Sequence, residues 1–448
     1  MARRKIYILG AVALLGGGAW LFFSIRKLEM AGSGLPSFVA YKNREIHERK
    51  LEESRQLPLM VLAAAPIAAN NYWTDYRGPN RAGVYDEKPI LTAWPKSGLT
   101  KLWKQPVGGG YASFVIADGL AYTIEQRRDS EVVAAYEIAT GRERWTNSWK
   151  AFFQEGMGGD GPRTTPVYDD GRLYALGAEG ELRSLDAATG KTIWNRNMLQ
   201  ENGASNLTWA QSASPLVVED KLIVLPGGSS GKSVVAYEKR TGKFLWGSQN
   251  DEQSYTSPSI VTLNGKRQIL VVSAIRAMGL AVEDGKLLWE FPWVTEYHVN
   301  AAQPIVVGPS RFFISAGYGH GAALVEVSNT GAKAVWENTK MKNKFSSSVL
   351  YQGHIYGLDE GILACIDANT GEQNWKGGRY GHGQALLASG HLVVLTEEGD
   401  LVLVKANPSK LEELAKIPAI DGKTWNNPAI ANGILFVRNT TEMAAFKL

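Results

Sequence analysis

Cysteine is almost absent from this chain of 448 residues, which carries only Cys365. One thiol cannot form an intramolecular disulfide, and it cannot build a zinc or iron-sulfur site of the usual kinds. An excess of one charge is also missing, because 48 Lys and Arg stand against 44 Asp and Glu. A surplus this small does not favour a groove that follows phosphates, so we expect no nucleic-acid partner.

Long apolar runs are scarce as well, and the one that could cross a bilayer covers residues 6–25. Its 20 uncharged residues would span about 30 Å as a helix. Arginine and lysine lie on both sides of the run, with a slight bias toward a cytoplasmic amino terminus. We therefore expect a cytoplasmic end at 1–5 and a single-pass inner-membrane anchor at 6–25. A cleaved signal peptide, which would leave a secreted periplasmic protein, is the alternative.

Residues 26–70 read as a spacer that is partly helical. Its segment 41–56 is dense in charged residues and helix formers, which predicts a solvated helix. The second apolar stretch, 57–69, is too short to span a membrane. Residues 71–98 are expected to lead into the main domain and to pack on it.

Tryptophan and glycine are abundant, with 14 and 48 copies, and both recur in one repeated phrase of the form A-x-D-x-x-T-G-x-x-x-W. Consecutive copies end at Trp145, Trp194, Trp246, Trp289, Trp336 and Trp375, which are 49, 52, 43, 47 and 39 residues apart. A period of about 45 residues with β-branched runs and glycine turns is typical of a four-stranded propeller blade. The tryptophans are predicted to pack between neighbouring blades, one in each repeat.

Eight inner strands can be counted, starting near residues 111, 165, 214, 257, 303, 347, 384 and 427. The last unit ends after its third strand, and 99–107, which contains Trp103, reads like an outer strand without partners. We therefore predict an all-β, eight-bladed propeller over 99–448, with four-stranded antiparallel blades. The amino-terminal and carboxy-terminal strands would pair to close the ring and leave no open sheet edge.

The repeat resembles the pyrroloquinoline quinone (PQQ) type of β-propeller, which includes outer-membrane assembly propellers (BamB-like) and quinoprotein dehydrogenases. The segments 73–85, 161–194 and 345–361 resemble bacterial PQQ-binding-like propeller proteins in particular. The resemblance extends from residue 73 to the end and is specific for fold more than for activity.

Loops that enter the inner strands and loops between second and third strands share one face of a propeller, around the mouth of the channel, where ligands usually bind. Polar and aromatic residues in these loops are the binding candidates. They are Arg163, Trp209, Gln211, Tyr255, His298, Asn300, Gln303, His320, Phe345, Trp425 and Asn426. Arg163 is of special interest because a cation at a narrow channel could hold an anionic ligand. No catalytic residue and no metal ligand is predicted.

Three functions remain open. The resemblance to assembly propellers implies a non-enzymatic scaffold, tethered to the membrane, that binds a protein or peptide partner in the periplasm and needs no cofactor. The resemblance to quinoproteins implies a PQQ-dependent alcohol or sugar dehydrogenase with calcium, but those enzymes carry adjacent cysteines and Cys365 stands alone. The third possibility is a sensor that binds a small molecule or glycan at the mouth.

Overall fold

The computed structural model describes residues 26–40, 44–56 and 71–448. The predicted cytoplasmic end at 1–5 and anchor at 6–25 lie outside the described residues, as do parts of the predicted spacer. Within the described ranges no helix is both long and apolar enough to cross a membrane.

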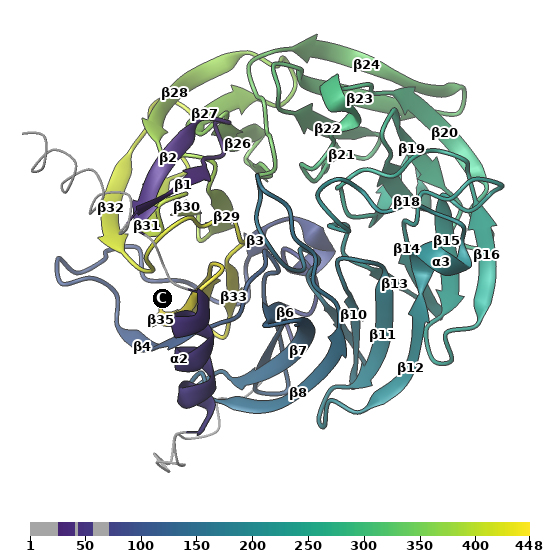
Figure 1. Cartoon of the computed structure of the whole chain (residues 1–448). Helices are drawn as coiled ribbons and strands as arrows, with labels where there is room; N and C mark the ends of the chain where they lie inside the picture. Colours follow the sequence, from purple (N-terminus) through teal and green to yellow (C-terminus); the bar gives the residue numbers. More distant parts are fainter. Residues whose placement is uncertain (1–25, 41–43, 57–70) are drawn as a thin grey trace, which may run out of the picture.

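The described residues form a ring of eight antiparallel sheets, the predicted eight-bladed propeller (Figure 1). Blade 1 consists of β5 (Val115–Ala117), β6 (Leu120–Arg127), β7 (Ser130–Glu137) and β8 (Glu143–Lys150). Blade 2 consists of β9 (Val167–Asp169), β10 (Arg172–Leu176), β11 (Glu181–Asp186) and β12 (Thr192–Asn197). Blade 3 consists of β13 (Leu216–Val218), β14 (Lys221–Val224), β15 (Val234–Glu238) and β16 (Phe244–Ser248). The short helix α3 (Met198–Glu201) follows β12.

Blades 4 to 6 repeat this plan. Blade 4 consists of β17 (Ser259–Leu263), β18 (Lys266–Val272), β19 (Arg276–Leu280) and β20 (Leu287–Pro292). Blade 5 consists of β21 (Ile305–Gly308), β22 (Arg311–Ala316), β23 (Gly321–Ser328) and β24 (Gly331–Asn338). Blade 6 consists of β25 (Val349–Tyr351), β26 (His354–Asp359), β27 (Ile362–Asp367) and β28 (Gln373–Arg379). The 3-10 turn η2 (Glu296–His298) lies in the loop that enters blade 5.

Blades 7 and 8 carry the additions that close the ring. Blade 7 consists of β29 (Gln384–Ala388), β30 (His391–Leu395), β31 (Asp400–Lys405) and β32 (Glu413–Pro418), with β3 (Val84–Tyr85) added in parallel beside β29. Blade 8 consists of β33 (Ala429–Ala431), β34 (Ile434–Arg438) and β35 (Glu442–Lys447), and β4 (Lys101–Pro106) pairs with β35 as its fourth strand. The predicted closure by the two ends of the propeller is therefore present.

The repeated phrase builds a turn on which the preceding blade rests. Asp186 Oδ1 accepts hydrogen bonds from the backbone N–H and the hydroxyl of Thr189, and Gly190 follows with φ of 73°. A Cβ on Gly190 would lie 2.3 Å from the indole ring of Trp145, the tryptophan of the blade before. Trp145 Nε1 also donates to the carbonyl of Ala187, 3.0 Å away. Glycine is required here both by the backbone angle and by the tryptophan that covers it.

Most of the repeat tryptophans make the same contact. Trp103, Trp194, Trp336 and Trp375 each donate through Nε1 to a backbone carbonyl of the next blade, respectively that of Ile138, Lys239, Ala368 and Asn407. Two members differ from this pattern. Trp246 packs on Gly285, but its buried Nε1 has no partner among the described residues, and Trp289 donates to Gln268 of its own blade. Trp289 still reaches the next blade, since its ring lies 5.3 Å from that of Phe312.

The lead-in segment packs on the propeller by passing through its centre (Figure 1). The carbonyls of Trp73 and Thr74 accept hydrogen bonds from Ile116 of blade 1 and Tyr168 of blade 2. The chain then turns through η1 (Pro79–Arg81) and reaches blade 7 as β3. Trp73, which the sequence left without a role, is fully buried in the hydrophobic core there.

Two arginines fix this central segment to the inner strands. Arg81 donates to the carbonyls of Ser214 in blade 3 and Pro258 in blade 4, and Arg77 donates to the carbonyl of Ser348 in blade 6. Both are almost fully buried and have φ of 58°. Burial lowers the pKa of Arg77. The ring is therefore held from the inside as well as at its closing strands.

Two amino-terminal elements, a hairpin and a helix, also contact the ring. The hairpin pairs β1 (Arg26–Met30) with β2 (Pro36–Ala40), and the helix is α2 (Arg44–Gln56). The predicted helix is present, but one side of it is not solvated, because Leu51 is 1% exposed and Glu48 is 6% exposed. Glu48 Oε1 accepts a hydrogen bond from the backbone N–H of Arg128, and Arg55 donates to the carbonyl of Pro106.

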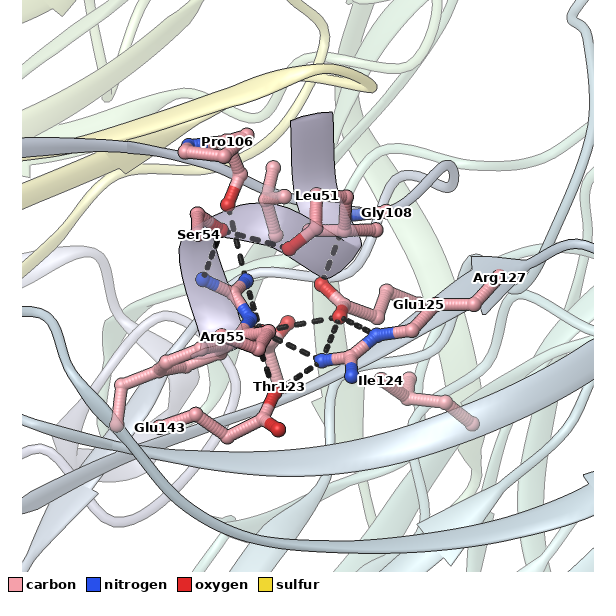
Figure 2. Close-up of polar contacts among 12 residues, drawn as sticks. Leu51, Ser54, Arg55, Pro106, Gly108, Thr123, Ile124, Glu125, Arg127 and Glu143 are labelled. Carbon is pink, nitrogen blue, oxygen red and sulfur yellow. Dashed lines mark hydrogen bonds and ion pairs between the residues drawn. The ribbon is translucent and has the colours of Figure 1, made fainter. Parts of the chain in front are cut away.

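Figure 2 shows the charged groups beneath α2. Arg55 Nε lies 3.1 Å from Glu143 Oε2, and Arg127 contacts both Glu143 and the fully buried Glu125. Burial alone would raise the pKa of Glu125, but Arg127, Arg438 and Arg55 outweigh it and hold that pKa below its ordinary value. A helix rich in charge can therefore dock because its charges find partners on the ring.

Candidate functional site: the propeller mouth

The predicted mouth is a cavity of about 210 Å³. Five of the predicted binding residues line it, and they come from the loops that enter five different blades: Arg163, Trp209, Tyr255, Phe345 and Trp425. Its lining also includes Tyr76 of the central segment and residues 30–32 and 34 of the hairpin. We use the name mouth cavity for this space.

Aromatic rings dominate the wall of the mouth cavity. Trp425 stacks on Tyr111 with ring centroids 5.3 Å apart and contacts Phe345 at 4.8 Å. Trp209 and Tyr255 form a second pair at 5.7 Å. These flat apolar surfaces suit aliphatic or aromatic groups of a ligand.

Arg163, the predicted anion holder, is already engaged. Its guanidinium donates to the carbonyls of Gly161 and Gly159 and pairs with Glu155 at 3.1 Å. It also lies over the ring of Tyr111, 5.5 Å from the centroid. Burial lowers its pKa. An anion at this site would have to compete with all of these contacts.

The predicted amide residues do not line the mouth cavity. Gln211, Asn300, Gln303 and Asn426 are buried, and their amide nitrogens donate to other groups of the protein. In each case the amide oxygen has no hydrogen-bond partner among the described residues. These side chains join the crowded strand ends around the channel.

The two predicted histidines also lie apart from the lining. His298 is exposed, 3.8 Å from Glu252. His320 packs edge-on against Trp293, with centroids 4.4 Å apart, and burial lowers its pKa. No group of three or more His, Cys, Asp or Glu side chains that could hold a metal ion occurs in the described part of the chain.

The tip of the hairpin occupies one side of the mouth, which the sequence did not predict. The N–H of Gly32 donates to Glu397 Oε1 at 2.5 Å, and its carbonyl accepts from Lys344 Nζ at 2.6 Å. Trp425 Nε1 also donates to Glu397 Oε1, and the N–H of His382 donates to Oε2. The backbone N–H and the backbone carbonyl of Gly32 are thus held by side chains of opposite charge.

The charge on Glu397 strengthens its hydrogen bond with the hairpin tip. Burial alone would raise the pKa of Glu397, but hydrogen bonds from His382, Gly32 and Trp425 lower it to about 2. Glu397 is therefore ionised at neutral pH and accepts charge-assisted hydrogen bonds, which are stronger than neutral ones. Burial lowers the pKa of Lys344. In the sequence, Lys344 directly precedes the predicted Phe345, whereas Glu397 lies in a loop between second and third strands that carried no motif.

The ring of eight four-stranded blades, with its repeated turn and tryptophan, defines an eight-bladed PQQ-like β-propeller. The family model described as "Outer membrane protein assembly factor BamB" matches residues 128–377, and the chain belongs to this family.

Curated relatives include both assembly factors and dehydrogenases. The chain is 25% identical over 224 residues to the outer membrane protein assembly factor BamB of Nitrosomonas eutropha, covering 47% of this chain and 50% of that protein. It is 22% identical to the 1-butanol dehydrogenase (cytochrome c) of Thauera butanivorans over 39% of this chain and 25% of that protein. The chain thus spans half or less of these two relatives. A longer match is the BamB of Burkholderia pseudomallei, 23% identical over 69% of this chain and 89% of that protein.

Solved structures agree on the fold. The BamB of Moraxella catarrhalis matches with a TM-score of 0.57 and 14% identity over 78% of this chain and 98% of that chain. A europium-containing methanol dehydrogenase matches with a TM-score of 0.60 and 13% identity over 87% of this chain and 91% of that chain. At these identities the likeness shows the propeller fold alone.

The residues present do not fit PQQ with calcium as the resemblance to quinoproteins describes it. Cys365 is buried in β27, has no second cysteine to pair with, and burial raises its thiol pKa to about 12. Calcium takes six to eight oxygen ligands, whereas none of the described residues that line the mouth cavity is an aspartate or a glutamate. Glu155 and Glu397, which contact lining residues, are engaged with Arg163 and with backbone N–H groups.

Proposed function

We propose that this protein is a non-enzymatic scaffold, tethered to the inner membrane, whose propeller mouth binds a polypeptide partner in the periplasm. The observation that supports it most is the grip of Glu397 and Lys344 on the backbone N–H and carbonyl of Gly32. A mouth built to hold peptide groups suits a protein or peptide partner. The family description, which names outer membrane protein assembly, points the same way.

The membrane tether in this proposal rests on the apolar run 6–25. The hairpin starts at Arg26, directly after the run, and its tip contacts the mouth at Gly32. Seven extended residues span at most about 25 Å. An anchor at 6–25 would therefore hold the mouth close to the membrane surface, where a membrane-bound partner could reach it.

Site-specific photo-crosslinking in intact membranes tests the proposal. A photoreactive amino acid would replace Met157 or Tyr297, both exposed and both in loops on the mouth face, and as a control Gln352, exposed in the first hairpin of blade 6 on the opposite face. We expect one adduct of defined mass, identified by mass spectrometry as the same protein from both mouth positions and absent from the control. No adduct at the mouth, or equal adducts at all three positions, would contradict the proposal.

The enzyme alternative is tested with the same full-length protein. Added PQQ with calcium should give no saturable quinone absorbance and no dye reduction with alcohols or sugars. Turnover with these additions would replace the scaffold by a quinoprotein dehydrogenase. A small molecule or glycan that copurifies in the mouth cavity, in the absence of any protein adduct, would instead favour a sensor.

A further inference from the structure

The hairpin tip is held in the mouth as a ligand would be, and its contacts define what else could sit there. We propose that the mouth binds a glycine-bearing turn of a partner polypeptide in which a bulky apolar residue precedes the glycine. In the free protein the chain's own tip, residues 30–34, occupies this place, and the partner's turn displaces it. This inference rests on the proposed function and specifies the chemistry of the partner.

Glycine is required by space at this position. A Cβ on Gly32 would lie 2.4 Å from both Cβ and Cγ of His382, closer than real side chains approach. His382 is 5% exposed, and its ring lies 5.6 Å from that of Phe345, so it has little room to move. The mouth therefore discriminates against any larger residue in the place of Gly32.

Two charged side chains bind the backbone of Gly32 on its two sides. Glu397 accepts from the N–H of Gly32, and Lys344 donates to its carbonyl. These contacts involve the backbone alone, so a turn from another polypeptide can make them equally well. Such recognition through main-chain atoms gives affinity without fixing the rest of the partner's sequence.

The residue before the glycine determines whether the partner's turn binds the mouth more tightly than the chain's own tip does. Ala31 lines the mouth cavity, and about 210 Å³ remains beside it among aromatic walls that include Trp209 and Trp425. The chain's own tip thus leaves apolar surface uncovered, and a larger apolar side chain at this position would bury it. Burial of that side chain would favour the partner's turn over the chain's own tip.

The resident tip is held weakly enough to leave. A two-stranded hairpin is marginally stable in water on its own, and β1 and β2 pair over only five residues each. Ser33 and Gly34 are exposed, and Leu35, the residue after the tip, is 68% exposed. Among residues 29–36, the part of the hairpin whose burial the structure describes, only Gly32 is buried.

Peptide binding to the full-length protein in detergent tests the exchange. The probe is a fluorescent synthetic peptide of residues 28–38 with its alanine at position 31 replaced by leucine, and its affinity is measured by anisotropy. The protein variant Gly32→Val removes the resident tip from the mouth, and Ser33→Val is the matched control. We expect the probe to bind Gly32→Val at least tenfold more tightly than the wild type or Ser33→Val, because the resident tip competes for the same place.

Two further measurements identify the contacts. The unsubstituted peptide should bind Gly32→Val at least fivefold more weakly than the leucine peptide, and a peptide with valine in place of its glycine should not bind. Adding Lys344→Met to Gly32→Val should weaken binding at least tenfold, while the thermal unfolding midpoint shows that the ring is intact.

Equal affinity of the probe for wild type and Gly32→Val, or no effect of Lys344→Met, would overturn the exchange. So would equal binding of the glycine and valine peptides. These results leave the photo-crosslinked partner of the scaffold proposal untouched, since that partner could contact the rim alone. Conversely, peptide exchange without any adduct in membranes would remove the scaffold proposal and keep the mouth as a peptide site.

Discussion

A single buried carboxyl, that of Glu131 in β7, makes the stability of the ring depend on pH. Glu131 is fully buried, Oε1 accepts from the N–H of Ala178 in blade 2, and Oε2 has no hydrogen-bond partner among the described residues. Burial raises its pKa from 4.5 to about 7. Between these values the folded protein keeps a proton that the unfolded chain has lost, so stability falls as pH rises from about 4.5 to about 7 and is then constant.

Replacing Glu131 with glutamine removes this titration. The shift corresponds to about 3 kcal/mol, so the stability of Glu131→Gln relative to the wild type should increase by about 2 kcal/mol between pH 5 and pH 8. Urea unfolding of the full-length protein at the two pH values measures it. The exposed Glu372→Gln is the control variant and is measured at the same two pH values. An equal stability difference between Glu131→Gln and the wild type at pH 5 and pH 8 would show that the buried carboxyl does not titrate in this range.

Contacts that recur with the repeat were predictable from the sequence, and contacts that single segments make with distant parts of the chain were not. The turn and the tryptophan recur from blade to blade along the sequence. The ring, its closure and the loops that carry Trp209 and Trp425 therefore follow from the period of the repeat. The hairpin tip at Gly32 and the paired side chains Lys344 and Glu397 occur once and meet only through contacts across more than 300 residues. No local sequence pattern predicts such a contact.

At the scale of an element, helix α2 shows most clearly how the environment of a segment can differ from what its composition predicts. Its composition predicts a solvated helix, because charged residues usually face water. The structure shows these charges paired with the ring and a single leucine, Leu51, fully covered. The burial of Arg77 and Arg81 in the central segment was not predicted either, because arginines usually face water as well. Their partners are backbone carbonyls of distant blades, which no local pattern in the sequence indicates.

Leu51 should be the residue that holds α2 on the ring. Replacing a buried leucine with alanine costs about 2 to 5 kcal/mol, which we expect to release the helix while the propeller stays folded. In Leu51→Ala, amide hydrogen exchange should accelerate in 44–56 and at Arg128, whose N–H is bonded to Glu48. The global urea midpoint should stay unchanged, and Arg49→Ala, on the exposed side, should behave like the wild type. A lowered global midpoint would instead show that α2 is part of the cooperative core of the ring.

At the scale of the whole molecule, one pairing makes the ring a closed object. β4 lies beside β35 with Ala445 opposite Trp103 and Ala444 opposite Lys104. Blade 5 contains the same arrangement within one hairpin, where Leu324 is opposite Trp336 and Ala323 is opposite Glu337. These two sites have the same local geometry and differ in the length of chain that joins them.

Engineered disulfides at the two sites distinguish the stabilisation that comes from closing the ring from the stabilisation that comes from linking two neighbouring strands. The pair Lys104→Cys with Ala444→Cys would close a loop of about 340 residues, and the pair Ala323→Cys with Glu337→Cys would close one of about 15. Chain entropy predicts stabilisation of about 6 and about 3 kcal/mol respectively, and Cys365 is buried away from both. We expect the ring-closing bond to raise the urea midpoint more, with both gains lost on reduction. Equal gains would mean that the unfolded chain already holds its two ends together, so that closure adds nothing beyond one more strand pair.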